Sequence, residues 1–434
     1  MRVLIVSMAA LAASISPAAA DTLTEAMVSA AESNPTLAAQ RQRLSATREA
    51  LPQAWAAALP QVSVSGSATA RDSDSDNPAL ESDRGETWSS SANVSQLLFG
   101  SGRVLASTRA ARAQIAGAVA DYELASQTLL LDVTRAYADV RQAQAVVAAR
   151  ETTVSNLTRL LEYAQAQFDA GVVTRTDVAQ SQARLAQART QLVQGQGALA
   201  AAVQAYQRLV GRPPSGLVAP SMTPGLPTDL QSALDISVDN SPVLIGAMAD
   251  TRLADANVDV AAAQGRMNVT LEAGTSMGAD FNDDTTESTT DSVGVRVSVP
   301  LFQGGAIRSR TRAQRALRSA SNLDLAAAQR SVQEAVTNAW TGLASARAAV
   351  DSARDQVEAA ELAYEGVTLE QETGLRSTVE VLDQEADLLT ARIALAQAER
   401  DLVVAERQML AAIGTLSIPE QSGGPIEDDQ LRGR

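Results

Sequence analysis

The sequence predicts an α+β protein in which two pairs of β-strands are combined with two pairs of very long antiparallel helices. Three observations predict this class. The chain carries an internal duplication, four segments alternate apolar with polar residues, and apolar residues recur every seven positions over long stretches. The duplication gives the order of the elements, and the two periodicities give their type.

Composition excludes several classes of function. The chain has 434 residues and a formal net charge of -15, which argues against a nucleic-acid partner because phosphates require a basic surface. It contains no cysteine, so it has neither a disulfide framework nor a thiol for a lipid anchor. It also contains no histidine, the commonest general base and zinc ligand. No nucleophile and base stand out together, so we expect no enzyme activity, no cofactor and no metal.

The first 20 residues have the pattern of a signal peptide. Arg2 supplies a positive start, an apolar run follows, and Ala18 to Ala20 form a small-residue cleavage site before Asp21. The apolar run is too short for a membrane-spanning helix, which needs about 20 apolar residues, and no later segment reaches that length.

The duplication relates positions 203 residues apart, as in the pairs Phe99 and Phe302 or Gly171 and Gly374. It predicts a first repeat at 21–210, a proline-rich linker at 211–228, a second repeat at 229–416 and an acidic disordered tail at 417–434. The segments expected in the two repeats are strands at about 61–71 and 87–98, long helices at about 103–170 and 174–209, strands at about 267–280 and 289–301, and long helices at about 303–373 and 377–413.

The four strands each have one apolar and one polar face. Val62 and Val64 alternate with serines in the first strand, and Val293 to Val299 alternate with polar residues in the last. This pattern suits a membrane barrel with lipid outside and a polar lumen, although four half-buried strands of a soluble sheet would alternate in the same way. Lipid does not tolerate open sheet edges. A barrel would therefore need eight strands from two copies or twelve from three, and the residues do not choose between them.

The helices show sustained seven-residue spacing, which predicts coiled-coil packing. At 1.5 Å per residue, a helix of roughly 65 residues extends about 100 Å, which indicates a tube or a rod. The apolar heptad positions are Val133, Val140, Val147, Val154, Leu161 and Phe168, then Val336, Leu343, Val350, Val357 and Tyr364 in the second repeat.

Glycine turns join the long helices in each repeat. Gly171 and Gly374 can take the left-handed conformation that ends a helix. Thr174 or Ser377 can then cap the following helix, and the acid three residues later, Asp177 or Glu380, completes a capping-box pattern.

Three segments carry a family resemblance: "NPTL" at 34–37, "VSVPLFQGG" at 297–305, and "TGLRSTVEVLDQEADLLTARIALAQAERDLVVAERQMLAAIGTL" at 373–416. They resemble TolC-family outer-membrane efflux proteins, and the resemblance extends to about Leu416. It implies a homotrimer in outer-membrane lipid with a twelve-stranded β-barrel, four strands from each subunit, and a periplasmic α-barrel of helices. It also implies a passive exit duct for drugs, small molecules or type I secreted proteins, located in the outer membrane of a Gram-negative bacterium and extending into the periplasm.

The resemblance further implies two partners and three sets of site residues. The partners are a periplasmic adaptor (membrane fusion) protein and an inner-membrane transporter. Glu380 and Asp383 match the pore constriction, where six carboxylates of a trimer would favour cations, bind multivalent cations and raise one another's pKa. The gate latch is matched by Arg376, with Thr176 and Asp177 as its expected partners, and by Gln371. The adaptor-docking tip is matched by Gly171, Val172, Val173, Gly374 and Leu375, in which an exposed valine pair and leucine are expected.

Two positions depart from the family pattern. Glu380 stands where the family has aspartate, and Gln371 stands where it has tyrosine, which predicts a weaker latch. From the residues alone, the acids could be helix caps only, and Arg376 and Gln371 could be solvated helix-end residues. The alternative function is a periplasmic coiled-coil scaffold or adaptor with a small soluble sheet. A channel dedicated to one secreted protein is the alternative within transport.

Overall fold

The computed structural model describes residues 21–73, 83–220, 223–281 and 283–418. The expected signal peptide and residues 419–434 of the expected tail lie outside the described residues. The described residues divide into two compact units, one formed by 21–39, 124–220, 223–241 and 332–418 and the other by 40–73, 83–123, 242–281 and 283–331. These units do not coincide with the two sequence repeats, because the long helices α4 (Arg103–Asp169) and α8 (Ala306–Glu372) contribute residues to both units.

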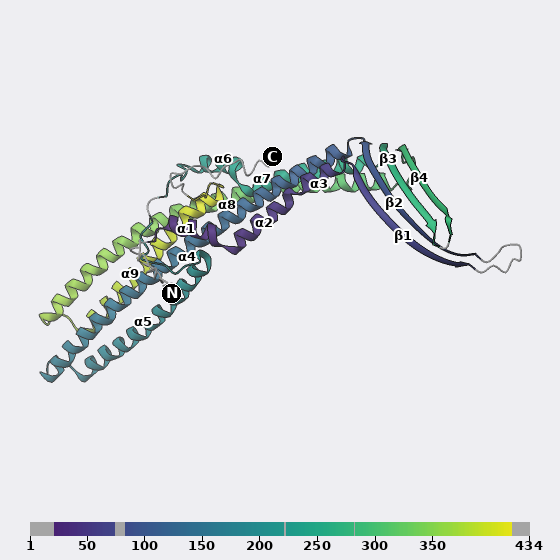
Figure 1. The fold of residues 1–434 in the computed structure, drawn as a ribbon. Coiled ribbons are helices and arrows are strands. Elements are labelled where there is room, and N and C mark those ends of the chain that lie inside the picture. Colours follow the sequence, from purple (N-terminus) through teal and green to yellow (C-terminus); the bar gives the residue numbers. More distant parts are fainter. Residues whose placement is uncertain (1–20, 74–82, 221–222, 282, 419–434) are drawn as a thin grey trace, which may run out of the picture. The chain divides into compact units, whose positions relative to one another are not determined.

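The second unit contains a four-stranded antiparallel sheet in the order β1-β2-β3-β4 (Figure 1). Its strands are β1 (Gln61–Ser73), β2 (Asp83–Phe99), β3 (Asn268–Asp280) and β4 (Asp283–Ser298). The second strand begins four residues before its expected start, and the fourth begins six residues early and ends three residues early. Side-chain alternation stops short of the hairpin turns, whereas backbone pairing continues through their polar residues.

The register of the sheet places residues of one kind in common rows. Val62, Val94, Ala273 and Val293 are consecutive partners across the four strands. The adjacent row, on the opposite face, contains Ser63, Asn93, Gly274 and Ser292. The sheet therefore has the apolar and polar faces that the alternation predicts. Val62 is 70% exposed and Val293 is 81% exposed, so none of the described residues covers the apolar face at these two side chains.

The second unit also contains helices α2 (Pro35–Arg48), α3 (Ala50–Ala56) and α7 (Pro242–Ala263), together with the first parts of α4 and α8. Proline opens α2 and α7, where its missing N–H group is not needed. Helix α8 begins three residues later than expected because Gly304 and Gly305 adopt positive φ angles of 57° and 82°. The end of α7 packs closely on the start of α8, since a Cβ atom on Gly265 would lie 2.8 Å from the Ile307 side chain.

The first unit contains two long helical hairpins (Figure 1). Helices α4 and α5 (Arg175–Val210) form one, and α8 and α9 (Thr378–Ala412) form the other. Helices α4 and α8 each have 67 residues, and their starts and ends are both 203 positions apart. Apolar heptad residues form the core of this unit, and those that are almost fully buried are Val133, Val140, Val336, Leu343 and Val350.

Short helices α1 (Leu23–Ser33) and α6 (Leu230–Asn240) and the start of the linker pack beside these hairpins in the first unit. The buried Tyr137 hydroxyl donates to the backbone oxygen of Asp21 or of Val218, at 2.8 and 2.6 Å. The Asp21 carboxylate accepts a hydrogen bond from Arg212 at 2.6 Å and one from the Ser215 backbone N–H at 3.0 Å. Long-range polar contacts thus fix a segment that has no regular secondary structure.

Across the described ranges, none of the helices combines the length and the apolar character that crossing a membrane requires.

Candidate functional site

The turns of the two hairpins share one backbone design. Gly171 has φ 75° and Gly374 has φ 79°. In each turn, the position that a Cβ atom of this glycine would occupy is surrounded by open space. In the first turn, the N–H of Gly171 donates to Phe168 and that of Val172 donates to Gln167, both at 2.9 Å. The second turn repeats both bonds at 2.9 Å, from Gly374 to Gln371 and from Leu375 to Glu370. These are the two bonds of a Schellman motif, which satisfies the last carbonyls of a helix.

Capping boxes follow both turns, as the sequence predicts. In the second, the Ser377 backbone N–H donates to Glu380 Oε2 at 2.9 Å, and the Glu380 N–H donates to Ser377 Oγ at 3.4 Å. Thr174 and Asp177 make the corresponding bonds at 2.9 and 3.4 Å. The pKa of Asp177 is lowered, first by the backbone hydrogen bond from Thr174.

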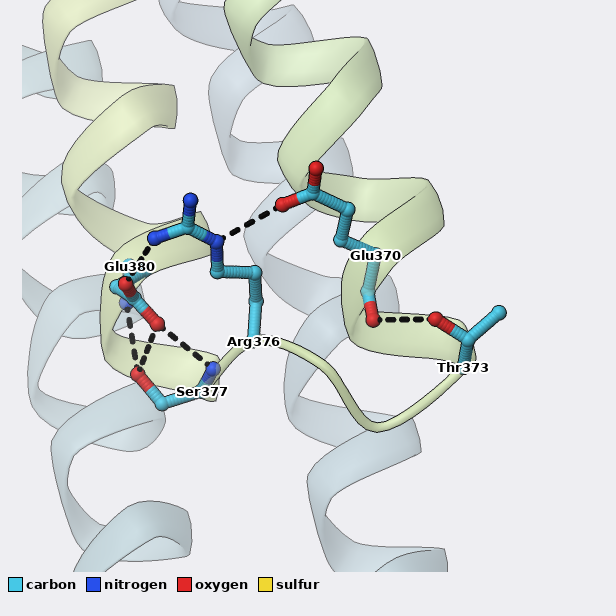
Figure 2. Close-up of polar contacts among 5 residues, drawn as sticks. All are labelled: Glu370, Thr373, Arg376, Ser377 and Glu380. Carbon is cyan, nitrogen blue, oxygen red and sulfur yellow. Dashed lines mark hydrogen bonds and ion pairs between the residues drawn. The ribbon is translucent and has the colours of Figure 1, made fainter.

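Arg376 joins the two sides of its own turn (Figure 2). Its Nε donates to Glu370 at 2.8 Å, and its Nη1 donates to Glu380 at 2.7 Å. In the single chain, these two acids rather than the expected Thr176 and Asp177 are the partners of Arg376. Glu370 and Glu380 lie six and four residues away on the same hairpin, so they are the local acids within reach, while Asp177 is engaged by Thr174.

These contacts set the charge state of Glu380. The backbone hydrogen bond from Ser377, followed by the hydrogen bonds from the Arg376 and Ser377 side chains, lowers the pKa of Glu380 to about 2. The rise that the resemblance implies concerns the six carboxylates of a trimer and stays a prediction, whereas in the single chain donors rather than other carboxylates surround Glu380. Glu380 acts both as a helix cap and as the partner of Arg376.

Asp383 has a different partner, which the sequence did not reveal. Its Oδ1 accepts a hydrogen bond from Arg184 Nη2 at 3.0 Å, so the ion pair joins α9 to α5 and hence one hairpin to the other. Both side chains are about half exposed. Arg184 lies seven residues after Asp177 and shares its helix face, and this spacing is the signal that could have identified it.

Gln371 and Glu385 are buried polar groups in this region. The Gln371 side chain is 7% exposed and donates to Thr378 Oγ1 at 3.2 Å, so it is not a solvated helix-end residue. Glu385 is 2% exposed and accepts two hydrogen bonds from Asn156, at 3.2 and 3.0 Å. Glu385 was not predicted from the sequence, although an acid between Val381 and Leu388 interrupts an apolar stripe of α9.

The residues of the expected docking tip differ in exposure. Val172 is 69% exposed and Leu375 is 76% exposed, whereas Val173 is half-buried. The exposed valine pair is therefore a single exposed valine. Thr176 is exposed as well. The two turns present one large apolar side chain each, directly after the glycine that ends the helix.

Comparison with known proteins identifies the family. The sequence model of a protein family described as outer membrane efflux protein matches residues 26–212 and 233–415. The chain is 30% identical over 407 residues to the outer membrane efflux protein BepC of Brucella suis, covering 92% of this chain and 87% of that protein. It is 28% identical over 419 residues to the outer membrane protein TolC of Vibrio cholerae, covering 92% of each.

The fold agrees with this relationship. The structure of the Campylobacter jejuni CmeC outer membrane channel superposes with a TM-score of 0.82 at 16% identity, covering 94% of this chain and 88% of that one. The family match covers both repeats, including the hairpin turns with their caps and ion pairs. This chain belongs to the outer membrane efflux protein family and is an exit duct of the Gram-negative outer membrane.

Proposed function

We propose that three copies of this chain assemble into a channel whose twelve-stranded barrel spans the outer membrane. The observation that carries this proposal is the sheet: its apolar face is exposed, and β1 and β4 form its two edges. An open edge in lipid would leave backbone groups without partners, so β4 of one copy must pair with β1 of the next. The TolC-family resemblance supports three copies rather than two.

The periplasmic hairpin tips serve as the docking surface for an adaptor protein, which links the duct to an inner-membrane transporter. Val172 and Leu375 support this role, because large apolar side chains exposed at helical turns suit a contact with another helical tip. The duct itself is passive, has no catalytic role, and conducts drugs, small molecules or type I secreted proteins with energy supplied by the transporter.

Glu380 and Asp383 form the pore constriction in this proposal. In a trimer, the two positions would bring six carboxylates together and favour the passage of cations. Arg376 and Arg184 offset part of that charge, because each pairs with one of the two acids. The selectivity of the duct thus depends on whether these ion pairs are made.

The gate latch consists of contacts between the two hairpins, with the Arg184–Asp383 ion pair at its centre. An exposed pair contributes only about 0–1 kcal/mol, so a docked adaptor can break it. Arg376, Gln371 and Asp177 have a different role, since they organise the two turns locally. Gln371 keeps a buried hydrogen bond to Thr378 where the family has tyrosine.

The decisive experiment is cell fractionation followed by gel analysis with and without heating. A heat-sensitive trimer in the outer-membrane fraction is expected, whereas a soluble periplasmic rod would contradict the proposal and favour a scaffold. Deletion of the gene, with drug susceptibility and the secreted proteome measured in parallel, then separates the cargo classes. Loss of only one secreted protein would indicate a dedicated secretion channel.

A further inference from the structure

The connections between the sheet and the helices have an unusual charge. The segments 99–112, 260–268 and 299–318 together contain nine arginines and no aspartate or glutamate. The complete chain has the opposite balance, with 50 acidic and 35 basic residues. These segments connect β2 to α4, α7 to β3, and β4 to α8, so they all lie at the same end of the antiparallel sheet. Positive charge is concentrated where the strands become helices.

Most of these arginines are available to a ligand. Arg308, Arg312 and Arg315 follow one another at intervals of four and three residues, so they share a face of α8, and all three are exposed. Each lacks an ion pair or side-chain hydrogen bond among the residues that the structure describes. We define the arginine collar as six of the nine residues: Arg103, Arg266, Arg308, Arg310, Arg312 and Arg315.

Two members of the collar also hold the connections together. Arg266 donates to the backbone oxygen of Ser101 at 3.4 Å, and Arg310 donates to Gln264 at 3.3 Å. These neutral partners leave the positive charges uncompensated. Two of the nine arginines have acidic partners and are left out of the collar: Arg109 pairs with Asp259, and Arg318 pairs with Asp255.

Large apolar side chains are exposed at the same end of the sheet. Trp55, just before β1, is 50% exposed, and Phe99, at the end of β2, is 52% exposed. Leu301 and Phe302, just after β4, are 92% and 87% exposed. A girdle of aromatic residues followed by basic residues is the arrangement that anchors proteins where hydrocarbon meets lipid headgroups.

We propose that the arginine collar binds the phosphates of anionic phospholipids in the outer-membrane leaflet that faces the helices. This inference rests on the proposed insertion of the sheet into the membrane. Arginine suits the role because its guanidinium group binds phosphate oxygens in a bidentate manner. The girdle places the collar at headgroup depth, and anionic lipid attracts basic residues beside a membrane-spanning segment. The resulting attraction fixes the depth of the sheet in the bilayer.

The proposed trimer provides an internal probe. Because β4 of one copy meets β1 of the next, the α8 arginines come beside the Trp55 of the adjoining copy. The chain has three tryptophans, so Trp88→Phe combined with Trp340→Phe leaves Trp55 alone. This variant is reconstituted with brominated phosphatidylglycerol or brominated phosphatidylcholine, and quenching of Trp55 fluorescence gives the relative binding constant of the two lipids.

We expect phosphatidylglycerol to be preferred at least roughly fivefold, the contribution of one basic residue near an anionic surface. Arg308→Gln with Arg312→Gln and Arg315→Gln should bring the preference toward unity. The matched control, Arg189→Gln with Arg208→Gln and Arg347→Gln, removes the same charge from exposed positions in the first unit and should leave the preference unchanged.

The outcomes separate this inference from the proposed function. Equal quenching by both lipids would overturn the collar and support insertion, whereas no quenching by either lipid would overturn insertion itself. Loss of the preference when sodium phosphate replaces chloride at equal ionic strength would assign the collar to free phosphate instead.

If the triple variant does not assemble, the unsubstituted arginines still provide a test. Their preference must fall as salt rises, and a preference insensitive to salt would contradict the proposal.

Discussion

Asn156 of α4 donates its side-chain amide to both carboxylate oxygens of Glu385 on α9, at 3.2 and 3.0 Å. Glu385 is almost fully buried, so this contact links the two hairpins through a carboxylate that has little access to water. It lies beside Leu157 of α4 and Leu382 of α9, which form a small apolar cluster with Leu185 of α5. The hairpins are thus joined by a buried polar contact as well as by the exposed ion pair of Arg184 and Asp383.

Removing Asn156 should destabilise the contact between the hairpins. Asn156→Leu leaves the buried Glu385 carboxylate without its amide donor, which costs about 1–3 kcal/mol. Thermal or denaturant unfolding in detergent measures the loss. Replacing both partners, as Asn156→Leu with Glu385→Met, should restore most of the stability because the buried carboxylate that lacks its amide donor is then absent as well. A double variant less stable than Asn156→Leu would contradict this account.

Tyrosine ionisation should destabilise the first unit only at high pH. Burial, followed by the charge of Glu385, raises the pKa of Tyr364 to about 12 from its ordinary value of 10.0. Burial also raises the pKa of Tyr206 to about 12. The folded-state pKa lies above the unfolded one, so this stability is fully present below about pH 10 and is lost as the pH rises through about 12.

Ultraviolet titration of tyrosinate together with unfolding at each pH checks the prediction. Tyr364→Phe should remove one late-titrating group and reduce the loss of stability above pH 10, and Tyr206→Phe should do the same independently. Ionisation of all tyrosines near pH 10 in the folded protein would show that burial does not control them.

The proposed constriction should determine ion selectivity. Glu380→Ala with Asp383→Ala should reduce cation selectivity and multivalent-cation block in planar-bilayer conductance. Because the pKa of Glu380 is lowered to about 2, its share of the selectivity should persist as the pH falls below the ordinary value of 4.5. Glu361→Ala is the control, since it removes a negative charge from α8 and leaves both acids of α9 in place. Unchanged selectivity in the double variant would rule out the assignment.

The Arg184–Asp383 pair should bias the gate toward closure. Either Arg184→Ala or Asp383→Ala should raise the open fraction of single channels, and a double-mutant cycle should give a coupling of at most about 1 kcal/mol. The Arg392–Glu361 pair is the matched control, because it joins α9 to α8 within one hairpin at 2.8 Å. Breaking the Arg392–Glu361 pair should leave the open fraction unchanged. If breaking either pair changed the open fraction equally, the Arg184–Asp383 pair would not be a latch.

The exposed apolar residues of the tips should be required for export and not for assembly. Val172→Asp with Leu375→Asp should abolish adaptor co-purification and export while the heat-sensitive trimer remains. Val193→Asp is the control, because Val193 is 67% exposed but lies within α5. Normal export by the tip variant would place the docking surface elsewhere.

The sequence by itself determined every feature that repeats locally. Alternation predicted the two faces of the sheet, the heptads predicted the buried stripes, and spacing predicted both capping boxes, because each depends on residues a few positions apart. Tertiary structure decided the contacts between hairpins. Arg184 and Asp383 are 199 positions apart, and Asn156 and Glu385 are 229 apart. Only the packing of α5 and α4 against α9 selects these pairs from many chemically equivalent ones. In the same structure, Arg376 pairs with Glu370 and Glu380 of its own hairpin.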